Sequence, residues 1–186
     1  MVRLVLAILL CQSITCLGQK AKVVDVIKNE VYELNGGLRS QFGGKSRIKI
    51  SLANIPANAI GLIYTAQAYG TDANIEKSLT LAMSISAMLS GNVPLADAIN
   101  EVQIPSSTKT VDMFLLPTLL DAENFICKND FKWRHFLDLD KEACNSCKVI
   151  TKWPLKSCGD AFIGIRNPSA LDPIKIVINV AAVVAE

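Results

Sequence analysis

The C-terminal segment DAFIGIRNPSALDPIKIVINVAAVVAE carries the pattern that most limits what this chain can fold into. Ile174, Ile176, Ile178 and Val180 alternate with other residues, so in an extended strand all four lie on one face. The Asn167-Pro168 pair before them is typical of a turn. The segment therefore predicts a strand, a turn and then a long strand with one buried face.

Four earlier segments also predict strands. Residues 20–34 mix helical and strand periodicity, but their β-branched content favours a strand. Residues 47–52 alternate strictly, as a half-buried strand does, and residues 60–70 and 111–116 are apolar and bounded by turn-forming residues. Strands thus dominate the predicted structure.

The middle of the chain predicts a helix. Residues 74–90 are rich in Ala, Leu and Met, contain no Pro or Gly, and stop at Gly91-Asn92. Asp72 is the expected N-cap of this helix. Residues 93–104 predict a shorter helix or a loop, and residues 121–147 a polar excursion bounded by cysteines.

The order of these elements predicts the fold class. The strands are separated by turns, with one helical insertion and without regular strand–helix alternation. We therefore expect an all-β domain with a helical insertion, built as an antiparallel β-sandwich of jelly-roll type.

The first 18 residues, MVRLVLAILLCQSITCLG, have the layout of a cleavable secretory signal. Arg3 precedes an apolar run that is too short to span a bilayer, and a polar stretch with small residues follows. The alternative is a buried N-terminal strand or a membrane anchor. We expect cleavage after Gly18, a single domain over residues 19–186, secretion to the extracellular space, and no stable transmembrane segment once the signal is removed.

Four cysteines, Cys127, Cys144, Cys147 and Cys158, remain after Cys11 and Cys16 leave with the signal. In an oxidising compartment an even number of cysteines favours two disulfides. A bridge between Cys144 and Cys147 would close a very small ring. The pairings 127–144 with 147–158, and 127–147 with 144–158, both stay open.

Two other readings of the cysteines have less support. A zinc ribbon needs two C-x-x-C knuckles, and the chain contains only one, at Cys144 and Cys147. A thioredoxin-like redox pair should precede a helix, whereas the β-branched segment KVITKW follows Cys147. We therefore expect structural disulfides and no metal or cofactor.

The charge balance excludes some classes of partner. Removing Arg3 with the signal lowers the basic residues from 19 to 18, against 17 acidic residues. Such a near-neutral chain provides no basis for nucleic-acid binding or for strong electrostatic binding to membranes.

Three segments of the chain resemble a group of exported, mostly bacterial β-sandwich modules. IPANAIGLIYTAQA (Ile55–Ala68), VDMFLL (Val111–Leu116) and FIGIRNPSALDPIKIVINVAAVV (Phe162–Val184) are similar to their patterns L-P-P-N-T-x-x-W-Y-Y, V-D-x-Y-L-L and Y-L-G-L-K-N-P with a final Val/Ile-rich strand. Leu62 stands at the tryptophan position of that pattern, and Ala57 at its second proline. The resemblance implies a β-sandwich and export, and it carries over no catalytic residues.

No catalytic set is apparent in the sequence. His135 is the only histidine, and no G-x-S-x-G elbow accompanies it. The GGKS segment at Gly43–Ser46 lacks the first glycine of a phosphate loop, because Arg39 stands there. The acidic segment LDLDKE, residues 137–142, lacks the glycine and glutamate of a calcium loop.

The best candidates for a ligand-binding surface are Trp133, Trp153 and the neighbouring Arg134. Aromatic faces bind both sugars and proteins, although these tryptophans could instead pack over the disulfides. We expect a secreted, non-catalytic binding or extracellular-matrix protein whose partner is an extracellular protein or a glycan. The alternatives are a membrane-active, pore-forming protein that inserts the helix over 74–90, and an enzyme of unidentified type.

Overall fold

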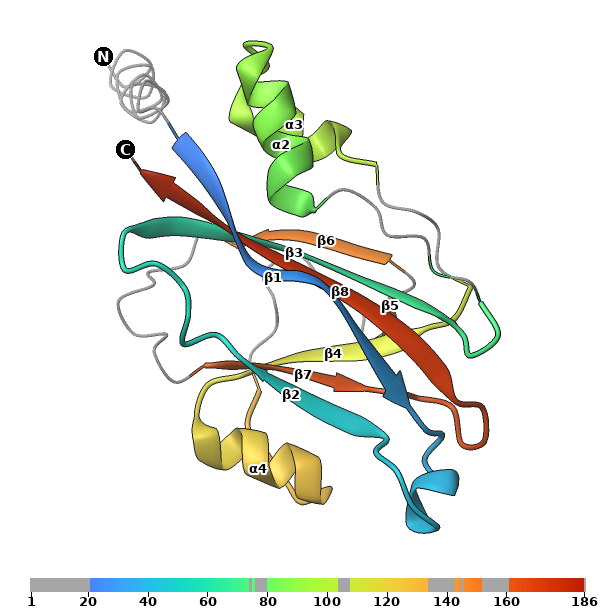
Figure 1. The fold of residues 1–186 in the computed structure, drawn as a ribbon. Helices are drawn as coiled ribbons and strands as arrows, with labels where there is room; N and C mark the ends of the chain where they lie inside the picture. Colours follow the sequence, from blue (N-terminus) through green and yellow to red (C-terminus); the bar gives the residue numbers. More distant parts are fainter. Residues whose placement is uncertain are drawn as a thin grey trace, which may run out of the picture.

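The computed structural model is mostly β, and the part of the chain that it describes contains antiparallel sheets and three α-helices (Figure 1). It describes residues 21–73, 75, 80–103, 108–133, 143–144, 146–151 and 161–185, and for 143–151 only the path of the backbone. In chain order the elements are β1 (Ala21–Leu34), η2 (Arg39–Gln41), β2 (Arg47–Ser51), β3 (Ala59–Gly70), α2 (Leu81–Ser90), α3 (Leu95–Glu101), β4 (Val111–Leu116), α4 (Leu119–Cys127), β5 (Ala143–Cys144), β6 (Ser146–Thr151), β7 (Phe162–Arg166) and β8 (Ile174–Ala185).

The strands form two antiparallel sheets. The first sheet has the order β1-β8-β3-β6 and the second the order β2-β7-β4-β5. Consecutive strands therefore alternate between the sheets, except that β4 and β5 pair within the second sheet. Because nearly every connection crosses from one sheet to the other, the pairing depends on contacts between residues far apart in the sequence.

The main hydrophobic core lies between the two sheets. It combines apolar side chains of β1, β3 and β8 with those of β2, β4 and β7. The predicted face of Ile174, Ile176, Ile178 and Val180 is confirmed, because all four side chains are fully buried in this core. Alternation in the sequence thus identified the inward face of β8 correctly.

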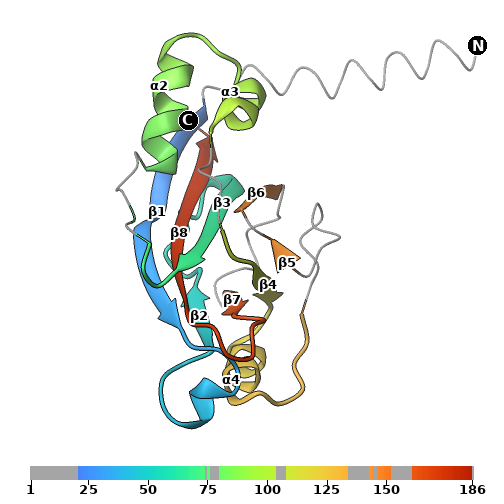
Figure 2. The ribbon, with the colours of Figure 1, turned by 90° about the vertical axis from the view of Figure 1, so that its right-hand side faces the viewer.

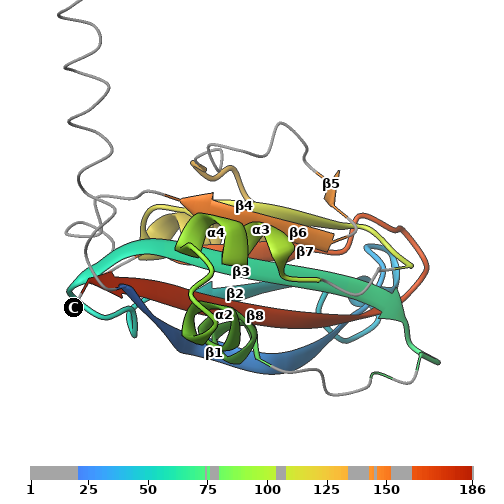
Figure 3. The same cartoon turned by 90° about the horizontal axis from the view of Figure 1, so that it is seen from above.

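The outer face of the first sheet is covered by α2 and α3 (Figures 1 and 3). Leu81, Ile85 and Ile99 of the helices pack there against Ala181 and Val183 of β8. The C-terminal half of β8 is therefore buried on both faces, which explains why its sequence changes from alternation to a continuous apolar run.

Helix α2 begins later than predicted. The predicted helix over 74–90 is confirmed over Leu81–Ser90 and in its end at Gly91, but its predicted start and its predicted cap, Asp72, are wrong, because the N-cap is Thr80. The Thr80 hydroxyl oxygen accepts from the Met83 amide at 3.3 Å and donates to Asp25 of β1 at 2.7 Å. The Ala82 amide donates to the other carboxylate oxygen of Asp25 at 3.1 Å. A residue from a distant strand therefore decides where the helix starts.

Replacing Asp25 with alanine is expected to lower the free energy of unfolding by about 1–2 kcal/mol, because the Ala82 amide loses its acceptor. Denaturant unfolding measures this change. Asp72→Ala is the matched control, since Asp72 is exposed and caps no helix, and it should alter stability by less than about 0.5 kcal/mol. Equal effects of the two substitutions would contradict the assignment of the cap.

Helix α4 overlaps the start of the segment predicted to be a polar excursion, and it covers the outer face of the second sheet (Figure 1). Thr118 caps it by accepting from the Asp121 amide at 3.1 Å. A Cβ on Gly164 of β7 would lie 2.7 Å from Leu116 Cδ1 and 3.0 Å from the Phe125 ring. Glycine at position 164 therefore allows Phe125 to approach the sheet closely.

Among the residues that the structure describes, no helix is sufficiently long and apolar to cross a membrane.

Candidate functional site

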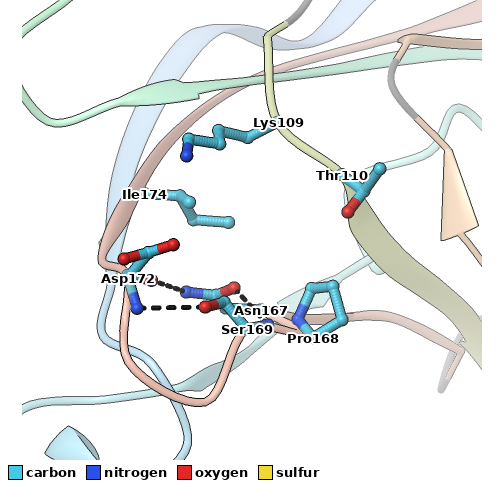
Figure 4. A pocket seen from close by; sticks show the side chains of 7 residues that line it. All are labelled: Lys109, Thr110, Asn167, Pro168, Ser169, Asp172 and Ile174. Carbon is cyan, nitrogen blue, oxygen red and sulfur yellow. Dashed lines mark hydrogen bonds between the residues drawn. The ribbon is translucent and has the colours of Figure 1, made fainter.

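A pocket of about 340 Å³ opens at one end of the molecule, where the turn between β7 and β8 meets the start of β4 (Figure 4). It is lined by Lys109, Thr110, Asn167, Pro168, Ser169, Asp172 and Ile174. The Thr108 and Lys109 amides both donate to the Ala68 carbonyl at 3.0 Å, which fixes this segment against the end of β3. Residues about sixty positions apart in the sequence thus share one pocket.

Asn167 holds the turn in place. Its side-chain amide donates to the Leu34 carbonyl at 3.3 Å and to the Asp172 carbonyl at 2.8 Å, and its oxygen accepts from the Ser169 amide at 3.0 Å. The predicted Asn-Pro turn, with Asn167 capping its own backbone, is therefore confirmed. Because its side-chain oxygen and nitrogen are engaged within the protein and it is buried, Asn167 supports the pocket rather than offering groups to a ligand.

The groups that face the pocket are chemically mixed. Figure 4 shows the Lys109 side chain extending above Ile174 toward Asp172, with the Thr110 hydroxyl facing in from the opposite side. Lys109, Thr110 and Asp172 are exposed, whereas Ile174 is buried and forms, with Pro168, an apolar part of the wall. The pocket thus offers a cation, a carboxylate and a hydroxyl beside apolar surface.

This arrangement can bind a polar ligand that also carries apolar surface. Sugars and other polyols combine hydroxyl groups with apolar ring faces, so a carboxylate, an ammonium group and an apolar wall complement them.

A second group of functional residue types lies on the outer face of the second sheet. Buried Asp112 accepts from Arg166 Nε at 2.6 Å and Nη2 at 2.5 Å, and the Arg166 guanidinium lies 5.4 Å from the Phe114 ring centroid. Arg47 donates to the Phe125 carbonyl at 2.7 Å. Burial, followed by repulsion from Arg166, lowers the pKa of Arg47. The charged groups of Asp112 and Arg166 bind each other, which indicates a structural ion pair.

Trp133, predicted to contact a ligand, belongs to an aromatic cluster on this face. Its ring meets Phe114 edge-on at a centroid distance of 5.5 Å, and Phe131 meets Phe125 edge-on at 5.1 Å. Trp133 remains 36% exposed. The other two predicted surface residues, Arg134 and Trp153, lie outside the described residues, as does His135.

Asp121 ties the segment after α4 back to the start of the helix. Its carboxylate accepts from the Thr118 hydroxyl at 2.6 Å and from the Lys132 amide at 2.9 Å. These hydrogen bonds, first that of Thr118, lower the pKa of Asp121 below its ordinary value of 3.8.

A lowered folded-state pKa makes this stabilisation pH-dependent. It is present above the pKa of the unfolded chain and is lost as the pH falls through the folded-state pKa. Asp121→Asn is therefore expected to be less stable than the parent protein at neutral pH, and the difference should disappear in acid. Denaturant unfolding at a series of pH values measures it, and a difference that grows in acid would contradict this prediction.

The structure describes the predicted disulfide cysteines only in part. Cys127 is exposed at the end of α4 and forms no disulfide with any cysteine whose side chain the structure describes. Cys144 lies opposite Val111 in the second sheet and Cys147 opposite Ala66 in the first, so the chain changes sheets between them. The side chains of Cys144 and Cys147, and all of Cys158, are outside the description. The two disulfides stay a prediction.

Non-reducing peptide mapping of secreted protein is expected to find two bridges among Cys127, Cys144, Cys147 and Cys158. Each closes a loop of a size that stabilises a fold by about 3 kcal/mol, so reduction should lower the midpoint of unfolding. Four free thiols, or zinc that co-purifies in stoichiometric amount, would contradict the prediction.

Within the described part of the chain, no group of three or more His, Cys, Asp or Glu residues is placed to hold a metal ion. No protein-family model, curated protein or solved structure matches the chain. The resemblance to exported β-sandwich modules therefore also stays a prediction.

Proposed function

We propose that this chain is a secreted, non-catalytic recognition domain with a jelly-roll β-sandwich, and that the pocket between Lys109 and Asp172 binds a saccharide. The observation that carries the proposal is the mixed lining of that pocket, a cation, a carboxylate and a hydroxyl set beside apolar surface.

The strand order supports the jelly-roll assignment. The described residues form eight strands in two four-stranded antiparallel sheets, and the chain alternates between the sheets, which is the arrangement expected for two interlocked Greek keys. Several lectins use this architecture, with ligands bound by loops at one end of the sheets. Export is supported by the expected signal over residues 1–18.

The pocket's size and rigidity support a small saccharide as the ligand. A volume of about 340 Å³ lies at the lower end of the range for small-molecule sites, which suits one or two sugar rings. The hydrogen bonds of Asn167 hold the turn before any ligand arrives. A preformed site loses little conformational entropy on binding, so a few polar contacts suffice.

Saturation-transfer NMR against a panel of mono- and disaccharides tests the proposal. At least one sugar is expected to bind, and Lys109→Met or Asp172→Asn should each weaken its binding about tenfold or more, the effect of losing a charge-assisted hydrogen bond. Lys22→Met is the matched control, because Lys22 is an exposed lysine at the start of β1, far from the pocket. Failure of the whole panel, or equal losses with Lys22→Met, would refute saccharide binding.

The alternative of a helix that inserts into membranes has less support. The apolar side chains of α2, Leu81, Ala82 and Ile85, pack against the first sheet, and the helix has ten residues. Releasing it would expose the outer face of β8. A framework role in an extracellular matrix is compatible with the proposed recognition domain, since a matrix component also needs a binding surface.

A further inference from the structure

Two neighbouring loops at one end of the molecule expose three large apolar side chains. Phe42 is 93% exposed, Leu171 60% and Leu38 52%. Phe42 and Leu38 belong to the loop 35–46 that contains η2, and Leu171 to the turn 167–173. We call these three residues the apolar tip; the loop and the turn that carry it lie at the lower right of Figure 1 and at the bottom of Figure 2.

Backbone contacts hold the two loops together. The Leu38 amide donates to the Ala170 carbonyl and the Gly37 amide to the Ser169 carbonyl, both at 2.9 Å. A Cβ on Gly36 would come within 2.6 Å of the backbone of Ala170 and Leu171. The loops therefore form one surface, and the side chains of the apolar tip project from a connected support.

The position of Phe42 is set by its neighbours. The turn η2 precedes it, and Gly43 and Gly44, with φ of 127° and 81°, follow it. Asn35 donates to the Gly43 carbonyl at 3.0 Å, which returns the chain to β2. Phe42 thus stands at the outermost bend of an anchored loop, with its side chain almost entirely in solvent.

The charge around the apolar tip is mainly positive. The loop 35–46 contains Arg39 and Lys45 and no acidic residue. Lys128, at the end of α4, donates to the Ser40 hydroxyl at 3.0 Å and adds a third cation. Asp172 is the one acidic residue in the turn 167–173. The chain as a whole is near neutral, so this positive charge is local to the tip.

We propose that the apolar tip docks on membranes rich in anionic phospholipid, with Phe42 and Leu171 entering the boundary between headgroups and acyl chains. Arg39, Lys45 and Lys128 then face the lipid phosphates. Apolar side chains beside Lys and Arg are the combination that binds membrane interfaces. A protruding Phe42 favours a soft bilayer over a protein partner, because a protein would need a matching pocket.

The proposal goes beyond saccharide binding and can fail separately from it. The apolar tip and the pocket share the turn 167–173, so the test uses Phe42 and Arg39, which do not line the pocket. The probes are vesicles of phosphatidylcholine alone and vesicles containing about one-third phosphatidylserine, with sedimentation measuring the bound fraction.

The parent protein is expected to bind the anionic vesicles and to be released by high salt, since salt screens exposed charges. Phe42→Ser should weaken binding roughly ten- to a hundredfold, the factor that burial of a phenylalanine side chain contributes. Arg39→Gln should weaken binding to the anionic vesicles about fivefold. Ile60→Ser is the matched control, because Ile60 is likewise an exposed large apolar residue but lies at the start of β3, at the opposite end of the sheet.

A gain of signal complements these losses. Phe42→Trp is expected to bind at least as tightly as the parent, with a blue shift of tryptophan emission on anionic vesicles that exceeds the shift of the parent protein. Phe42→Ser should also unfold at the parent's temperature, because its side chain packs on nothing.

Four outcomes would overturn the proposal. These are no binding to either vesicle, equal binding to both, equal losses with Phe42→Ser and Ile60→Ser, and a parent dimer in size-exclusion chromatography that Phe42→Ser dissociates. The last outcome would assign the apolar tip to contacts between copies of this chain.

Discussion

Phe125→Ala is expected to lower the free energy of unfolding by about 3–5 kcal/mol. Phe125 belongs to α4, and its ring is fully buried between that helix and the second sheet, with its centroid 5.4 Å from that of Phe114 and 5.1 Å from that of Phe131. The Arg47 guanidinium lies 5.1 Å from the same ring. Truncation to alanine removes the main apolar contact between α4 and the second sheet and leaves a cavity beside Gly164.

Denaturant unfolding followed by far-ultraviolet circular dichroism measures this loss. Leu120→Ala is the matched control, because Leu120 lies on the same helix and is 70% exposed. Its replacement should change stability by less than about 0.5 kcal/mol. If the two variants were equally stable, α4 would not be held to the sheet by Phe125.

Arg166→Met is expected to lower the free energy of unfolding by about 3 kcal/mol, the lower end of the range for breaking a buried ion pair. The Asp112 side chain is almost completely buried, whereas that of Arg166 is 36% exposed. Without Arg166, the Asp112 carboxylate loses both of its charged hydrogen bonds and stays in an apolar setting. Because the Arg166 side chain is partly exposed, we expect the loss of stability to stay at this lower end of the range.

The double variant Asp112→Leu with Arg166→Met separates the cost of an uncompensated Asp112 carboxylate from the loss of its attraction to Arg166. It is expected to recover most of the lost stability, because the penalty arises from the uncompensated carboxylate rather than from the missing attraction. Lys49→Met is the control, since its carboxylate partner Glu123 is 52% exposed and stays solvated, so the substitution should cost less than about 1 kcal/mol. A double variant as unstable as Arg166→Met would contradict this explanation.

The side chains of Phe125 and Arg166 lie on the outer face of the second sheet and line neither the pocket nor the apolar tip. The pocket and the apolar tip both use the turn 167–173, whereas α2 and α3 lie beside the C-terminal half of β8. Variants in Phe125 or Arg166 should therefore change stability while the folded fraction still binds sugar and vesicles. Binding that disappeared in these folded variants would place the functional surface near Trp133 instead.

Most of the strands could be predicted from the sequence. The segments 20–34, 47–52, 60–70 and 111–116 correspond within one residue to β1, β2, β3 and β4, and the final alternating run corresponds to β8. A half-buried strand must alternate apolar and polar side chains, so its signal is local. Such a local signal can be recognised from the sequence without knowing which strands pair.

The helices were predicted less well, for two physical reasons. The start of α2 depends on Asp25, about 55 residues earlier, which no local pattern contains. Helix α4 has nine residues and buries Ala122 and Phe125 as its apolar contacts, too few to produce a clear helical period. The Thr118 cap was the one local signal that could have located it.

The candidate site shows the same division. The Asn167-Pro168 turn was identified from the sequence, but Lys109 and Asp172 were not linked, because the pocket forms only when β8 pairs with β3 in one sheet and β7 pairs with β4 in the other. Trp133 was predicted to contact a ligand, which stays a prediction, and its packing on Phe114 was not foreseen. Both the pocket and the packing of Trp133 join residues that are distant in the sequence, so no local pattern of residues predicts them.

By itself the sequence determined which segments extend, which of their faces are apolar, and where the chain turns, since these follow from the chemistry of neighbouring residues. Only the tertiary structure decided which strands pair, where α2 begins, that α4 covers the second sheet, and which loops meet at the apolar tip. Those choices depend on contacts between residues that are distant in the chain, and such contacts exist only once both sheets have closed around their common core.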